Sequence, residues 1–175
     1  MNKNPVKLVD LAKKRFGNVP KRPGVYIVCW VKDGRPRPLQ RLLGIDDHGI
    51  LYIGATKSKE GLKGRLKALW NSVRRAFEGR SSSPHTFGPT LIYTNLICKV
   101  RKDELAVWYK DYDDSDYVEA QEKRTLYEYT KRYGEPPPLN LQVGRQYLAI
   151  IGLGILGKSI LAPELDPELK DIITP

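Results

Sequence analysis

The chain has 175 residues, of which 41% are hydrophobic and 29% charged, and its formal net charge is +10 at pH 7. This length suits one ordinary domain with a short appendage, and the composition excludes a disordered chain. The excess of lysine and arginine favours a polyanionic partner, although the same charge would also serve simply to keep the protein soluble. Charge alone does not separate DNA from RNA or from a membrane surface.

Cysteine usage and the lack of an apolar leader point to a reducing compartment. Cys29 and Cys98 lie far apart in apolar contexts, without the close pairing of a metal site, and we expect both to be reduced core residues. The first residues lack the apolar core of a signal peptide. The longest apolar stretch, residues 147–156, is too short and too glycine-broken to span a bilayer. We therefore expect a cytoplasmic protein without a membrane partner.

Hydrophobic periodicity predicts the elements of the first half of the chain. Residues 7–16 carry apolar side chains at helical spacing. Residues 25–31 are β-branched and aromatic, which is typical of a strand. Glycine and proline make residues 33–48 a long connection, after which residues 50–53 form a second strand, antiparallel to the first. A helix then begins near residue 60, and its apolar stripe consists of Leu62, Leu66, Leu69, Trp70, Val73 and Phe77.

The second half continues with one strand and two helices. Residues 79–84 break the basic helix. Residues 90–99 fit a helix or a strand, and we favour a helix because residues 105–112 make the better third strand. The last helix covers residues 116–133, with lysine and arginine in its final turn and Gly134 after it.

The last helix carries a carboxylate on its inward face. Asp116 and Glu119 have the spacing of a capping box at its start. The inward face is marked by Val118, Thr125, Leu126 and Tyr129. Glu122 falls on the same face, and a buried carboxylate is costly unless it is paired, hydrogen-bonded or bound to a cation. Glu122 is therefore the preferred metal ligand, and a salt bridge to an arginine at the core edge is the alternative.

Basic residues dominate the helix that begins near residue 60. Arg65 borders its apolar stripe. The other cations that we expect to contact the phosphates of a polyanionic partner are Lys59, Lys63, Lys67, Arg74 and Arg75. Such a stripe matches an electrostatic footprint for phosphates, and an ordinary solvated helix face is the alternative.

Two tyrosine motifs, Pro23-Gly24-Val25-Tyr26 and Leu51-Tyr52-Ile53-Gly54, resemble the paired signature of the GIY-YIG nuclease superfamily. Further similarity follows in the order of that family. Arg65 resembles its arginine on the first major helix, Glu122 its metal-binding glutamate, and Pro137-Pro138-Leu139-Asn140 its proline–asparagine ending. The resemblance covers about residues 20–140.

The resemblance implies an α/β (α+β) fold, with a small three-stranded antiparallel sheet and helices on both sides. It implies a metal-dependent DNA endonuclease in which Glu122 holds one Mg²⁺ or Mn²⁺ against the scissile phosphate. Arg65 would neutralise charge on the phosphate. Tyr26 or Tyr52 would help to deprotonate the attacking water, and which of the two is the base stays open. Biological tasks of such an enzyme include restriction, repair and homing.

Three further residues complete the expected catalytic set. Lys57 stands where the family often has a lysine, and it would lower the pKa of a tyrosine. Asn140 would position hydrogen bonds around the ion or the glutamate. Several family members have a histidine or tyrosine one turn after the arginine, but Leu69 stands there in this chain. His85, from the following loop, would take its place as a proton donor, and a surface loop histidine is the alternative. Val25 replaces the isoleucine of the motif, and the first loop is longer than usual.

The expected domain organisation has three parts. Residues 1–19 form an N-terminal helical extension, residues 20–141 the nuclease domain, and residues 142–175 a tail that packs on the domain or makes a dimer contact. Monomer and homodimer both stay open, as does RNA in place of DNA. The rival function is a catalytically inactive, basic nucleic-acid-binding module of the same fold. Residues 152–159 fit the phosphate-loop pattern, but proline interrupts the short sequence that follows, and a glycine-rich packing segment is favoured.

Overall fold

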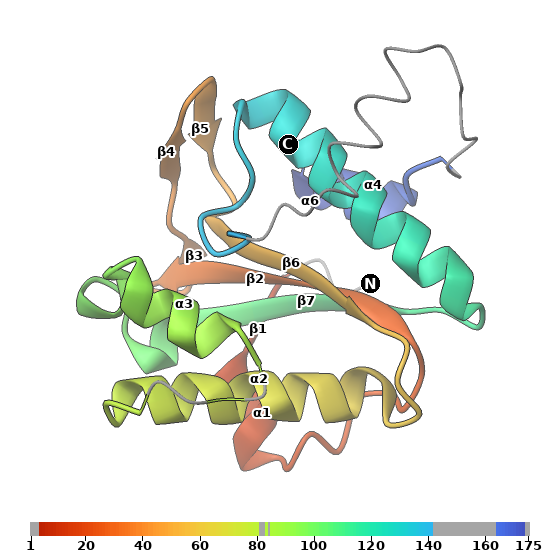
Figure 1. Ribbon diagram of the computed structural model, residues 1–175, viewed down its shortest axis with the longest axis horizontal. Helices are drawn as coiled ribbons and strands as arrows, with labels where there is room; N and C mark the ends of the chain where they lie inside the picture. The colour runs from red at the N-terminus through yellow and green to blue at the C-terminus, as the bar shows by residue number, and fades with distance from the viewer. Residues whose placement is uncertain (1–3, 81–82, 84, 142–163, 174–175) are drawn as a thin grey trace.

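A curled antiparallel sheet forms the centre of the computed structural model, which describes residues 4–80, 83, 85–141 and 164–173 (Figure 1). The sheet has five strands in the order β1-β7-β2-β3, with β6 pairing on β2. Their bounds are β1 Val6–Lys7, β2 Gly24–Lys32, β3 Arg35–Pro36, β6 Ile50–Thr56 and β7 Leu105–Asp111. The three predicted strands are β2, β6 and β7. The expected total of three is wrong, because the two-residue strands β1 and β3 add to the sheet and are too short to show a period of two.

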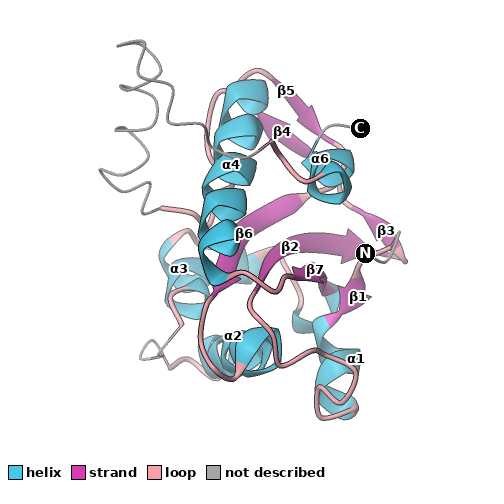
Figure 2. Cartoon of the chain, turned by 90° about the vertical axis from the view of Figure 1, so that its right-hand side faces the viewer, coloured by secondary structure: helices cyan, strands magenta, loops and turns pink. Residues whose placement is uncertain are grey.

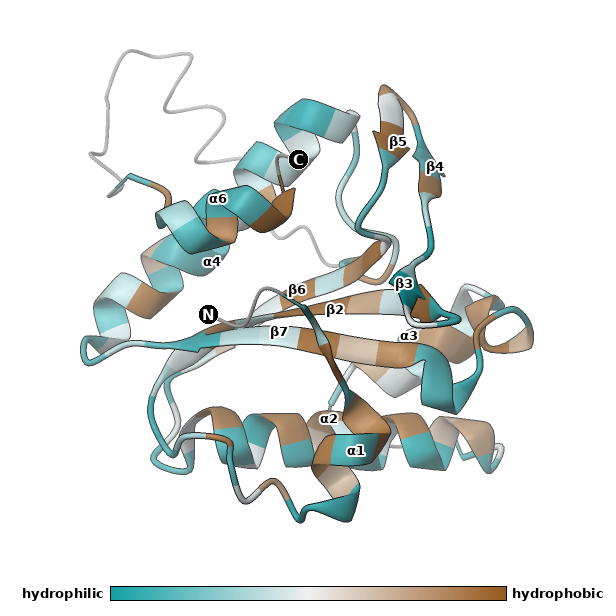
Figure 3. Ribbon diagram, turned by 180° about the vertical axis from the view of Figure 1, so that it is seen from behind, coloured by the Kyte–Doolittle hydropathy of each residue, from teal (hydrophilic) through white to brown (hydrophobic). Residues whose placement is uncertain are grey.

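Helices cover both faces of the sheet, as predicted (Figures 1 and 2). Alternate residues of β2, such as Tyr26 and Val28, face a core made with α1 (Leu8–Lys13), α2 (Gly61–Phe77) and α3 (Phe87–Tyr93). The opposite set faces a second core made with α4 (Ser115–Tyr133) and α6 (Pro167–Ile173). In Figure 3 the hydrophobic and hydrophilic bands alternate along α2, as expected for a helix with one buried face.

The N-terminal residues are part of the sheet and of its first core. The predicted helix at residues 7–16 is shorter, because Val6 and Lys7 pair with β7 before α1 begins. Leu8 and Leu11 of α1 are buried in the first core. The helix ends before Arg15 and Phe16, which both have positive φ.

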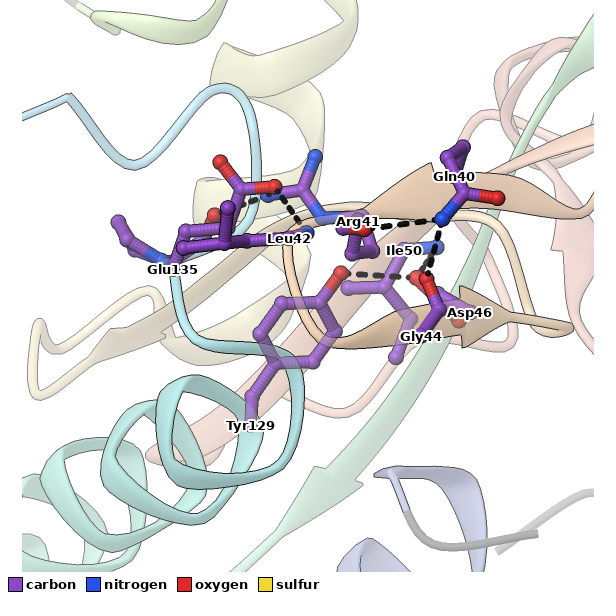
Figure 4. A network of polar contacts seen from close by, with 9 residues as sticks. Gln40, Arg41, Leu42, Gly44, Asp46, Ile50, Tyr129 and Glu135 are labelled. Atoms are coloured by element: carbon purple, nitrogen blue, oxygen red, sulfur yellow. Dashed lines mark hydrogen bonds and ion pairs between the residues drawn. The ribbon is translucent and has the colours of Figure 1, made fainter.

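Residues 33–48 hold more regular structure than the expected long connection. They contain β3 and a two-stranded ribbon, β4 (Leu39–Arg41) with β5 (Gly44–Asp46). The buried Asp46 at the base of the ribbon accepts hydrogen bonds from Ile50 N at 2.7 Å and Tyr129 Oη at 2.9 Å (Figure 4). It also accepts one from His48 N at 3.0 Å. Because Tyr129 belongs to α4, this carboxylate ties the ribbon and β6 to that helix.

Two local predictions near the helices are corrected. Asp114, not Asp116, caps α4, since its carboxylate accepts the Asp116 N–H at 2.8 Å and the helix begins at Ser115. The predicted helix at residues 90–99 is α3 followed by a short 3₁₀ turn, Leu96–Cys98, after Asn95 adopts a left-handed conformation. That turn leaves Cys98 exposed, so its assignment to the core is wrong, whereas Cys29 is buried as predicted.

The described part of the C-terminal tail packs on the domain. Leu169, Ile172 and Ile173 of α6 lie in the second core. Gln121 of α4 donates to the Glu164 carbonyl at 2.9 Å and accepts from Asp166 N at 2.8 Å. The apolar stretch at residues 147–156 and the phosphate-loop pattern lie outside the described residues. Within the described ranges, no helix is both long and apolar enough to cross a membrane.

Candidate active site

Antiparallel pairing of β2 with β6 brings the two motif tyrosines side by side. Tyr26 lies opposite Gly54, and the Tyr26 and Tyr52 rings are 6.0 Å apart between centroids, on the face covered by α2 and α3. A Cβ on Gly54 would lie 2.7 Å from Tyr26 Oη and 2.6 Å from Tyr52 Cε1. Glycine is therefore required at this position because the two phenols occupy the space that any side chain would need.

The Tyr26 hydroxyl is buried and contacts two nitrogen donors. Arg65 Nε donates to it at 3.0 Å, and His85 Nε2 lies 2.9 Å away. The Phe87 backbone N–H donates to His85 Nδ1 at 3.1 Å, so Nδ1 is unprotonated and the neutral ring carries its proton on Nε2. The Tyr26 oxygen therefore accepts from both Arg65 and His85.

Charge in this cluster is set by burial and by the guanidinium. Burial, together with the charge of the nearby Arg65, lowers the pKa of His85 to about 3. His85 is thus neutral at physiological pH and acts as an N–H hydrogen-bond donor. Burial raises the pKa of Tyr26 well above its ordinary value, and Tyr52 adds to the rise while Arg65 opposes it. His85 is only 1% exposed, so the alternative of a surface loop histidine is wrong.

Glu122 approaches the phenols from the other face of the sheet. It lies on α4 and is partly buried, with the buried Val118 and Thr125 on the same helix. Burial raises the pKa of Glu122, while Arg65 and a hydrogen bond from the Ala55 backbone lower it. Arg65 on α2 and Glu122 on α4 are therefore close enough to interact electrostatically, although the two helices lie on opposite faces of the sheet (Figure 2).

A single carboxylate in this position fits a hydrated divalent ion. Mg²⁺ keeps several waters and is often bound through only one or two protein carboxylates together with substrate phosphates. Among the described residues, no three histidine, cysteine, aspartate or glutamate side chains cluster as a metal site. Glu122 therefore suits an ion that is completed by water and by the substrate, and does not suit a closed structural metal site.

Lys57 and Asn140 make contacts that their sequence positions do not indicate. Lys57 follows β6, and its Nζ is 2.5 Å from Glu119 Oε2. The Asn140 amide pairs twice with the backbone of Ile53, accepting from its N–H at 2.9 Å and donating to its carbonyl at 2.8 Å. Asn140 thus fixes the segment after α4 against β6, next to Gly54, and supports the strand that carries Tyr52.

Ser72 is a site residue that the sequence analysis missed. Its buried hydroxyl donates to the His85 carbonyl at 2.7 Å and accepts the Gly88 N–H at 2.8 Å. This pair of bonds fixes the His85 loop to α2. A signal was present in the sequence, since Ser72 is a polar residue on the apolar side of α2, beside the buried Leu69 and Val73.

The predicted DNA-contacting cations lie on α2 and in the turn before it. Lys59, Lys67 and Arg74 are exposed, whereas Lys63 and Arg75 are partly buried. Arg74 is also engaged by Glu78 at 2.8 Å, one helical turn later.

A surface hollow lies elsewhere, lined by Asn4, Val6, Asn18, Pro20, Val107, Trp108, Tyr109 and Asp111. None of the predicted site residues lines it. Comparison of the chain with protein-family models, with curated proteins and with solved structures found no match.

Proposed function

We propose that the chain is a metal-dependent endonuclease that hydrolyses DNA phosphodiester bonds, of the GIY-YIG type. The observation that carries the proposal is the Tyr26 hydroxyl, which accepts hydrogen bonds from Arg65 at 3.0 Å and from His85 at 2.9 Å. Tyr52 lies beside it, and Glu122 lies within electrostatic range of Arg65. These five residues come from five separate segments of the chain, namely β2, β6, α2, the loop after α2, and α4.

Two donors on one phenol oxygen favour Tyr26 over Tyr52 as the base. A phenol ordinarily has a pKa near 10, and burial makes ionisation harder still. Hydrogen bonds from a guanidinium and an imidazole N–H stabilise the phenolate and offset part of that cost. As a phenolate, Tyr26 would accept the proton of the attacking water.

Arg65 and Glu122 would act on the phosphate. Arg65 holds Tyr26 through Nε, and the terminal nitrogens of its guanidinium would contact the scissile phosphate and balance the charge that develops there. Glu122 would hold the hydrated Mg²⁺ or Mn²⁺. The bound ion would supply Lewis-acid stabilisation of the phosphate and of the leaving oxygen.

The test is nicking of supercoiled plasmid in the presence of Mg²⁺ or Mn²⁺. Removing a preorganised charge-stabilising group typically lowers the rate by about 10²–10³-fold, and we expect that loss for Glu122→Gln and for Arg65→Ala. Tyr26→Phe should also lose nicking. Glu128→Gln is the matched control, since Glu128 is on the same helix but pairs with Arg124 at 2.8 Å.

Two results would count against a nuclease. A wild-type protein that binds DNA but nicks with neither metal would support the inactive binding module instead. Nicking by Glu122→Gln at the wild-type rate would remove the carboxylate from the mechanism.

A further inference from the structure

An ion-pair cluster lies immediately beside Glu122. Glu119 is three residues before it on α4, and both of its oxygens are engaged by lysines. Lys57 Nζ is 2.5 Å from Oε2, and Lys123 Nζ is 2.6 Å from Oε1. Lys57 comes from the end of β6, so the cluster links the strand that carries Tyr52 to the helix that carries Glu122.

The two lysines are spaced to bind two oxygens of one anion. Each ammonium takes a separate oxygen of the carboxylate, and a phosphodiester offers two non-bridging oxygens in a similar arrangement. The Glu119–Lys123 contact alone would be an ordinary pair one turn apart on a helix. Lys57 is 62 positions away in sequence, and its approach from another element makes the cluster a two-point anion site.

The carboxylate can be displaced because the cluster is open to solvent. The side chains of Lys57, Lys123 and Glu119 are 46%, 36% and 40% exposed. Ion pairs at such exposed positions contribute little to stability. A phosphate can therefore replace Glu119 between the lysines without large loss to the fold.

We propose that Lys57 and Lys123 form a binding site for a DNA backbone phosphate next to the scissile one, and that Glu119 occupies this site in the free protein. The proposal rests on the proposed nuclease function and deepens it. Glu119 then acts as an internal competitor, and productive binding of DNA requires its carboxylate to leave the lysines.

The test measures binding of a fluorescent DNA duplex by anisotropy, with a chelator present so that no cleavage occurs. Glu119→Gln keeps the shape of the side chain and removes the competing charge, and we expect about fivefold tighter binding at low salt. Glu78→Gln is the control, because it makes the same change of net charge and frees Arg74 on the expected DNA-binding helix. It should tighten binding less than Glu119→Gln does.

The lysines are tested through the salt dependence of binding. If both lysines contact the same phosphate, the double variant Lys57→Gln/Lys123→Gln reduces the slope of log K against log salt by about 0.9, the contribution of one phosphate contact. In that background Glu119→Gln should tighten binding no more than Glu78→Gln does.

The outcomes separate this proposal from the proposed function. If the wild type nicks DNA but Glu119→Gln and Glu78→Gln bind alike, the phosphate site is refuted and the nuclease stands. An unchanged salt slope in the double lysine variant also overturns the site. If the wild type neither binds nor nicks DNA, both proposals fail.

Discussion

The buried His85 gives the protein a pH dependence of stability whose sign is fixed by the structure. The side chain is 1% exposed, with Nδ1 accepting the Phe87 N–H and Nε2 contacting the Tyr26 hydroxyl. Protonation of Nδ1 would break the first bond and bury a charge beside Arg65. We predict that His85→Gln removes this dependence, because glutamine does not titrate but keeps an N–H donor and an oxygen acceptor.

The size of this pH-dependent change in folding stability follows from proton linkage. An unfolded histidine has a pKa of about 6.5, whereas burial lowers the pKa of His85 to about 3 in the folded protein. Between these values the unfolded chain binds more protons, so this contribution to stability is fully present above pH 6.5 and is lost as the pH falls. From pH 7 to pH 5 the loss is about 2 kcal/mol. Any folded pKa below about 4 gives nearly the same figure, since His85 is then still neutral at pH 5.

The measurement is urea unfolding of the wild type and of His85→Gln at pH 7 and pH 5. The wild type should lose about 2 kcal/mol more than the variant over this interval. Comparing the two pH values within each protein cancels any fixed cost of the substitution. Equal pH dependence of the wild type and His85→Gln would refute the neutral, buried His85.

Three further predictions concern packing around the site and the exposure of the two cysteines. Gly54→Ala places a methyl group between the two phenols, and thermal unfolding should show a loss of about 1–3 kcal/mol together with loss of plasmid nicking. Ser72→Ala leaves two buried backbone groups without their partner, so urea unfolding should show a loss of about 2–4 kcal/mol; a loss near zero would refute the link between α2 and the His85 loop. Cys98 should react with a thiol reagent in the folded protein, whereas Cys29 should react only after unfolding.

The sequence predicts the larger elements because they are periodic over many residues. The strands β2, β6 and β7 are β-branched and aromatic, and α2 has an apolar stripe over 17 residues. The elements that escape prediction are short or depend on distant partners. The ribbon at residues 39–46 is held by Asp46, whose partner Tyr129 is 83 residues away in sequence. No local pattern reveals such a contact.

The sequence likewise predicts part of the candidate site and misses the contacts that depend on distant elements. The order of motifs indicates Tyr26, Tyr52 and Arg65, and antiparallel pairing of two predicted strands is enough to bring the tyrosines together. The partner of Lys57 was not predictable, because its contact with Glu119 depends on how α4 lies across the end of β6. Helical spacing predicted that Glu119 takes part in a capping box, but in the structure its carboxylate forms ion pairs with Lys57 and Lys123.

Leu69 stands where the proposed GIY-YIG pattern often has a histidine or tyrosine, and the structure shows what surrounds Leu69 and His85. Leu69 lies one turn after Arg65, is fully buried and packs in the same core as Tyr26. A polar side chain there would have to displace apolar contacts of that core. The second donor to Tyr26 comes instead from the loop after α2, and Ser72, one turn beyond Leu69, binds that loop through the His85 carbonyl. The helix α2 therefore still controls both donors, one through the Arg65 side chain and the other through the Ser72 hydroxyl. A substitution at Ser72 should consequently affect the environment of Tyr26 without contact between the two residues.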